Sequence, residues 1–123
     1  MKKSLPILLL LALLLSCKDK SPGASLELCG VKDPINNLKW LKDMMDQARD
    51  KKEEKMITVV AVKLRGETII NYYALYMSCI GCIGYHCDGS RLDMSKYTQE
   101  EIQQYRKNIW EKKGDRIVLW SAE

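Results

Sequence analysis

Five cysteines are the residues whose types and spacing could do chemistry, and they lie at positions 17, 29, 79, 82 and 87. A cysteine thiolate is both a nucleophile and a metal ligand, and two thiols can be oxidised to a disulfide. Cys79 and Cys82 form a C-x-x-C pair, and His86 and Cys87 follow closely. This cluster could therefore hold disulfides, exchange electrons with other thiols or bind zinc.

Two disulfides are the first interpretation of the four cysteines after Cys17, because small exported domains are often cross-linked to supplement a modest core. If residues 82–87 are extended, five steps of about 3.3 Å place Cys82 and Cys87 beyond the roughly 7 Å limit for a bridge. Two pairings then remain open. They are Cys29–Cys87 beside Cys79–Cys82, and Cys29–Cys82 beside Cys79–Cys87.

A redox pair or a metal site is the alternative use of the cluster. A thioredoxin-type pair has its first cysteine at a helix N-terminus, whereas Cys79 follows the strand-like sequence YYALYM. Zinc takes four tetrahedral ligands, but the adjacent His86 and Cys87 point to opposite faces if they lie in a strand. We therefore expect no metal and no cofactor.

Cys17 ends a targeting segment. Lys2 and Lys3 precede an uncharged run at 5–15, LPILLLLALLL, which is shorter than the about 20 residues of a membrane-spanning helix and has the order of a secretion signal. The following LLSC, at 14–17, resembles the bacterial lipobox. The resemblance implies cleavage after residue 16 and acylation of Cys17, and two or three acyl chains hold a protein stably on a membrane.

The rest of the chain divides into a tether and one domain. Residues 18–26, KDKSPGASL, have the composition of a flexible linker. We assign 1–16 to the signal, 17–28 to the lipidated cysteine and tether, and 29–123 to a single domain, which suits the length. Without residues 1–16 the formal charge falls from +4 to about +2, which is too small to indicate nucleic acid as a partner.

Hydrophobic periodicity predicts the first elements of the domain. A helix begins at Asp33-Pro34, where Asp caps free N–H groups and Pro occupies the first turn. Its buried stripe is Ile35, Leu38, Leu41, Met45 and Ala48. The β-branched run Met56–Leu64 predicts a central strand, and Thr68–Met77 forms a hairpin with it through a turn at 65–67.

The second half contributes a shorter hairpin, a helix and a last strand. Residues 83–87 and 91–94 flank Asp88-Gly89, a pair that favours a tight turn. Thr98 and Glu101 form a capping box for a helix to Lys113, with Ile102, Tyr105 and Ile109 buried and Gly114 as its stop. Arg116–Trp120 completes the sheet. We predict an α+β fold, near αβββαβ, with a mainly antiparallel sheet of about four or five strands packed by two helices.

Aromatic residues are the remaining candidates for a surface. Trp40, Trp110 and Trp120 lie in or beside apolar patterns, so we expect them in the core. Tyr72, Tyr73 and Tyr76 cannot all face inward in a regular strand. An exposed tyrosine patch for a protein partner is therefore a minor hypothesis.

A second resemblance rests on residues spread over the domain. They are Asp33-Pro34, Leu38-Lys39-Trp40-Leu41-Lys42, Cys79-x-x-Cys82 and Tyr85-His86-Cys87-Asp88-Gly89. Together they are similar to small lipoproteins of unknown function that are common in the Bacteroidota. Those relatives often have further cysteines after the Asp-Gly turn, whereas none follows Cys87 here. The resemblance implies an envelope lipoprotein without implying an activity.

Catalysis is not expected, because the sequence has one histidine, no phosphate-binding glycine loop and acidic residues mainly on predicted helix surfaces or loops. We expect a non-catalytic binding or structural domain with an envelope protein as its partner. Lipid would hold it to the inner or outer membrane of the cell envelope, on the periplasmic or the surface face. A metal-handling or thiol-redox lipoprotein that uses Cys79, Cys82 and Cys87 is one alternative. A protein inhibitor is the other.

Overall fold

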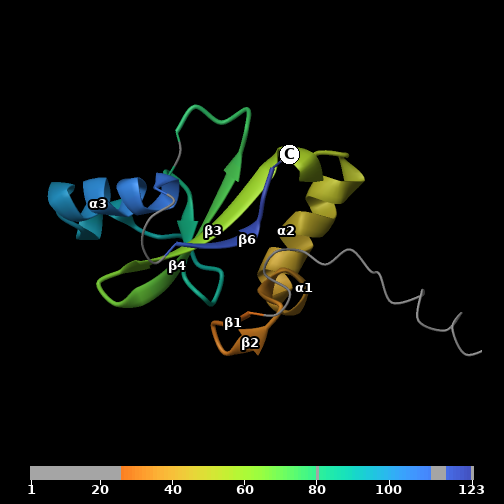
Figure 1. The fold of residues 1–123 in the computed structure, drawn as a ribbon, viewed down its shortest axis with the longest axis horizontal. Coiled ribbons are helices and arrows are strands. Elements are labelled where there is room, and N and C mark those ends of the chain that lie inside the picture. Colours follow the sequence, from red (N-terminus) through yellow and green to blue (C-terminus); the bar gives the residue numbers. More distant parts are fainter. Residues whose placement is uncertain (1–25, 80, 112–115, 123) are drawn as a thin grey trace, which may run out of the picture.

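The computed structural model describes residues 26–79, 81–111 and 116–122, and shows an antiparallel sheet between two layers of helix (Figure 1). Its elements are β1 (Glu27–Leu28), β2 (Val31–Lys32), α1 (Pro34–Asn37), α2 (Lys39–Asp50), η3 (Glu54–Met56), β3 (Ile57–Leu64), β4 (Glu67–Ala74), β5 (Gly84–Tyr85), η4 (Met94–Lys96), α3 (Gln99–Trp110) and β6 (Ile117–Trp120). The sheet order is β5-β4-β3-β6, and β1 pairs with β2 separately. The predicted α+β class is confirmed, with the small β1–β2 hairpin placed ahead of the helices.

The central hairpin follows the sequence prediction closely. β3 and β4 pair antiparallel from Ile57 with Ala74 to Leu64 with Glu67. Arg65 and Gly66, which join them, both have positive φ, as a two-residue type I′ turn requires. β4 ends at Ala74 rather than at Met77, because the Met77 amide donates to the Ala74 carbonyl and turns the chain.

Alternate residues of β3 face two separate cores, which explains its nearly continuous apolar sequence. Val59 and Ala61 pack in the core below α2, whereas Val60 and Val62 pack in the core below α3. Figure 1 shows α1 and α2 on one side of the sheet and α3 on the other. The expected burial of this strand on both faces is therefore confirmed.

The first helix begins at Pro34 as predicted but is broken after one turn. Leu38 is extended (ψ 110°), and α2 starts at Lys39. Asp33 does not cap α1 with its side chain, which corrects the prediction, because its left-handed backbone (φ 48°) is not that of a capping residue. All five residues of the predicted stripe are nevertheless buried: Ile35, Leu38, Leu41, Met45 and Ala48.

Helix α3 has the predicted capping box and an earlier end than predicted. Thr98 and Glu101 satisfy each other's amide groups, and Ile102, Tyr105 and Ile109 are buried. The helix ends at Trp110, and Glu111 is extended, so its predicted extension to Lys113 is wrong. Residues 112–115, including the proposed stop at Gly114, lie outside the described residues.

The second hairpin is smaller than expected. β5 pairs with β4, and only a single bridge joins Tyr85 to Arg91 on the other side. The predicted strand 91–94 does not form, because the Asp93 side chain accepts from the Ser95 amide and starts η4.

At the N-terminal end of the described chain, β1 includes the last two residues of the range 17–28 that we assign to the tether. None of the described helices has the length and apolar character needed to cross a membrane.

The Glu101 carboxylate should make stability depend on pH in the acid range. Hydrogen bonds from Arg65 and from the Thr98 amide lower its pKa from 4.5 to about 2. Since this pKa is depressed in the folded state, the carboxylate contributes stability above its unfolded pKa and loses it as the pH falls toward about 2. In Glu101→Gln, urea unfolding should show a smaller loss of stability over this range. Parallel losses in the variant and the wild-type protein would contradict the assignment.

Candidate binding groove

The four cysteines of the domain are paired as two disulfides. Cys29 is bonded to Cys87, with their Cα atoms 5.4 Å apart, and Cys79 to Cys82, with their Cα atoms 5.5 Å apart. This is one of the two pairings that the sequence leaves open. Cys87 is therefore tied to the β1–β2 turn, so Cys79, Cys82 and Cys87 do not act as one three-thiol cluster. Cys17 lies outside the described residues.

The remaining member of the proposed metal cluster, His86, has a different partner. Its Nδ1 atom lies 2.5 Å from a carboxylate oxygen of Glu67. Among the described residues, no group of three or more His, Cys, Asp or Glu side chains is placed to hold a metal ion. Near the C-x-x-C pair, the Arg106 guanidinium lies 4.0 Å from the Cys82 sulfur.

Trp40 holds the backbone beside the Cys29–Cys87 disulfide. The Trp40 indole N–H donates to the Cys87 carbonyl oxygen at 2.9 Å, and its ring centroid lies 5.2 Å from that of Tyr85. Gly89 (φ 89°) allows the turn after Cys87 to approach the Trp40 ring. Trp40 and Gly89 thus fix the turn that carries the disulfide.

The exposed tryptophan is Trp110, which corrects the prediction that all three are core residues. Trp40 and Trp120 are partly buried, and each donates its indole N–H to a backbone carbonyl. Trp110 is 60% exposed, because it lies next to Ile109 and so points about 100° around α3 from the buried stripe. Leu75 (54%) and Tyr76 (63%) are the other large apolar residues exposed in the described parts of the chain. Tyr76 lies apart from the other two, since its hydroxyl donates to Glu53, just after α2. We call Leu75 and Trp110 the apolar rim.

A groove opens between the rim and the sheet. Its volume is about 270 Å³. It is lined by Thr58, Val60, Asn71, Tyr73, Leu75, Ile109, Trp110, Arg116 and Ala122. The groove lies at the C-terminal end of α3, since Ile109 and Trp110 of its last turn line it.

Asn71 is the one polar residue among the buried residues of the described chain, at 1% exposure, and it forms part of the groove. The Tyr105 hydroxyl donates to its side-chain oxygen at 3.3 Å, and burial raises the pKa of this tyrosine. The Asn71 amide nitrogen, Nδ2, has no hydrogen-bond partner among the described residues. Gly84 makes the arrangement possible, since a Cβ there would lie 2.6 Å from the Tyr105 hydroxyl.

Arg116 supplies positive charge to the groove wall. Its Nη1 atom donates to the carbonyls of Ile109, at 2.8 Å, and of Trp110, at 3.4 Å. These carbonyls belong to the last turn of α3, where no helical amide remains to bond them. The guanidinium is therefore held beside the groove and closes the helix end.

Comparison with known protein families, with curated proteins and with solved structures finds no match. The function is therefore inferred from the chain itself.

Sequence reasoning missed most of the groove. Tyr73 lines it, whereas Tyr72 packs against the core below α2 and the exposed Tyr76 donates its hydroxyl to Glu53, so the three tyrosines do not form one patch. The signal that could have indicated the site is Asn71, a polar residue within the apolar strand sequence TIINYYA. A buried amide there requires partners from elsewhere in the fold.

Proposed function

We propose that this protein is a lipid-anchored, non-catalytic binding domain of the bacterial cell envelope, which contacts another envelope protein through the apolar rim. The lipobox-like sequence at 14–17 supports the anchor. The two disulfides are of the kind found in oxidising, extracytoplasmic compartments. The single observation that carries the binding role is the exposure of Leu75 and Trp110, which lie together beside the groove.

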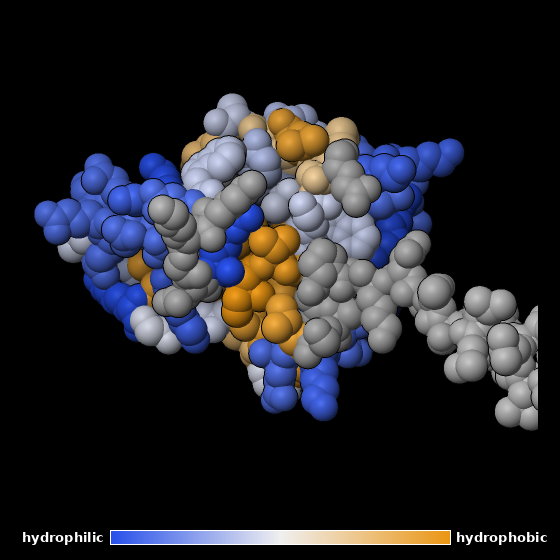
Figure 2. Space-filling model, in the orientation of Figure 1, coloured by the Kyte–Doolittle hydropathy of each residue, from blue (hydrophilic) through white to orange (hydrophobic). Residues whose placement is uncertain are grey.

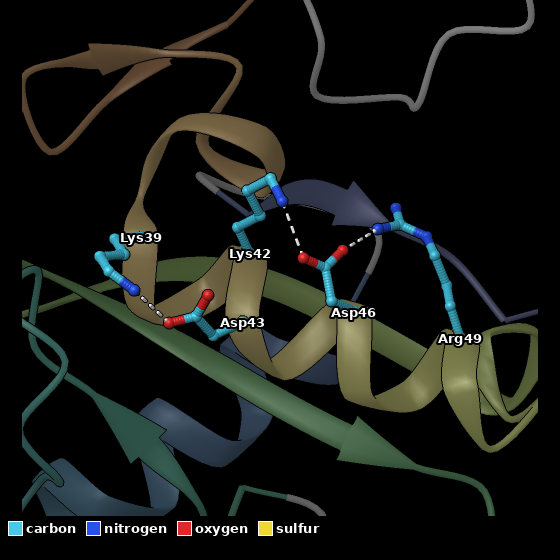
Figure 3. Close-up of polar contacts among 5 residues, drawn as sticks. All are labelled: Lys39, Lys42, Asp43, Asp46 and Arg49. Atoms are coloured by element: carbon cyan, nitrogen blue, oxygen red, sulfur yellow. Dashed lines mark hydrogen bonds and ion pairs between the residues drawn. The ribbon is translucent and has the colours of Figure 1, made fainter.

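The rim differs from the rest of the surface in its chemistry. The outer side of α2 carries ion pairs of Lys39 with Asp43 (2.8 Å) and of Asp46 with Lys42 and Arg49, at 2.7 and 2.9 Å (Figure 3). Figure 2 shows a mostly hydrophilic face with hydrophobic residues gathered at its centre and at its top. Trp side chains are enriched where proteins meet, because they bury much apolar area with few rotatable bonds. The rim is therefore the surface best suited to a protein partner.

Two experiments in cells test the two halves of this proposal. A clickable palmitate analogue should label the wild-type protein and not Cys17→Ala. A photo-reactive amino acid at position 75 or 110 should give cross-links to the same envelope protein, identified by mass spectrometry, whereas one at position 43 on the outer side of α2 should not. Labelling of Cys17→Ala would overturn the anchor. Equal cross-linking from positions 43, 75 and 110 would overturn the rim as the binding surface.

A further inference from the structure

We propose that the groove binds a small amphiphile, which is a molecule with an apolar body that ends in a carbonyl or carboxylate oxygen. This goes beyond the proposed function, because a protein could contact the rim without anything entering the groove. The argument depends on the unpaired amide of Asn71, the size of the groove and the charge of Arg116.

The Asn71 amide determines which end of a ligand enters. Its oxygen already accepts from Tyr105, and its Nδ2 atom has hydrogens to donate but no partner among the described residues. A buried donor without an acceptor costs folding free energy, which an acceptor in the groove would recover. The end of the ligand that reaches Asn71 therefore carries an acceptor oxygen.

The groove determines the size and polarity of the rest of the ligand. At about 30 Å³ for each water molecule, its volume of about 270 Å³ holds about nine waters, or a ligand with about ten non-hydrogen atoms. Val60, Leu75, Ile109 and Trp110 provide apolar walls. A single short aliphatic chain or one aromatic ring with a short tail fits this space.

Charge selects between possible head groups. Arg116 places a permanent positive charge on the groove wall. A carboxylate would be attracted to this charge and can accept from Asn71. An ammonium group of the same size can only donate, so it would leave the Asn71 amide unpaired and would be repelled by Arg116.

Octanoate and octylamine are matched probes, because they share a chain length and differ in the head group. The titrated protein is the mature chain that the lipobox predicts, residues 17–123 with Cys17→Ser, in buffer without detergent. Octanoate should shift the amide NMR signals of groove residues such as Thr58, Tyr73 and Trp110, with saturation at submillimolar to millimolar concentration. Octylamine should bind at least about tenfold more weakly.

Two variants test the assigned contacts. Asn71→Leu keeps the approximate side-chain size and removes the donor, so its affinity for octanoate should fall about tenfold. Trp110→Ala removes an exposed wall residue and should weaken both probes without unfolding the domain. Lys39→Ala, on the outer side of α2, is the control and should bind octanoate as the wild-type protein does.

Equal binding of octanoate and octylamine to the wild-type protein, or no shift of groove signals by either probe, would overturn the proposal. This comparison needs no variant, so it decides the question even if Asn71→Leu does not fold. Cross-links from positions 75 and 110, found for a protein that does not bind octanoate, would leave the proposed function intact. Octanoate binding without those cross-links would support the amphiphile site and would contradict the proposal of a protein partner.

Discussion

Replacing Cys29 and Cys87 together by serine is expected to lower the free energy of unfolding by about 4 kcal/mol. The two cysteines are 58 residues apart in sequence, so their disulfide closes a long loop and reduces the conformational entropy of the unfolded chain. The loop-entropy relation gives about 3 kcal/mol for a 15-residue loop and about 4.7 kcal/mol for a 100-residue loop. Urea unfolding of the double variant and the wild-type protein, followed by circular dichroism, measures the loss.

The Cys79–Cys82 pair provides the matched control for this experiment. These cysteines are three residues apart, and the same relation gives a stabilisation of about 2 kcal/mol. The double serine variant of this pair should therefore be the more stable of the two. A loss as large as that of the Cys29 and Cys87 variant would show that loop length does not determine the contribution of these disulfides.

Gly89→Ala is expected to lower the free energy of unfolding by about 3 kcal/mol. A Cβ at this position would lie 2.7 Å from Cγ of Trp40 and 2.9 Å from its Cδ1. The ring has little room to move, because its N–H is bonded to the Cys87 carbonyl and it packs on Tyr85. The left-handed backbone costs an L-residue about 1–2 kcal/mol, and overpacking adds about 1–3 kcal/mol. Thermal or urea unfolding measures the sum.

Gly66→Ala separates these two effects. Gly66 has a similar φ of 77°, but a Cβ there would meet nothing within 4 Å. The variant should therefore lose only the backbone contribution, about 1–2 kcal/mol. If both alanine variants lost the same stability, the contact with Trp40 would carry no energetic weight, and the proposed support of the disulfide turn would be wrong.

Local features of the fold were determined by the sequence itself. The capping box of Thr98 and Glu101 forms as predicted, and the turn predicted at 65–67 is formed by Arg65 and Gly66, because each depends on neighbours within three residues. The stripe from Ile35 to Ala48 is buried even though Leu38 breaks the helix, since its spacing keeps the apolar residues on one side. Alternation along β3 likewise divides its residues between two cores.

Only the tertiary structure decided which distant residues meet. The partner of Cys29 depends on how the β1–β2 hairpin lies against the turn at Cys87, 58 residues away in sequence. No local pattern in the sequence predicts that contact. Trp110 is exposed because it lies beside the buried stripe of α3, and Asn71 is buried because Tyr105 of that helix packs on it. The hydrophobic pattern of the sequence determines which residues become buried. The packing of the helices and strands determines where a cavity and an unpaired hydrogen-bond donor remain.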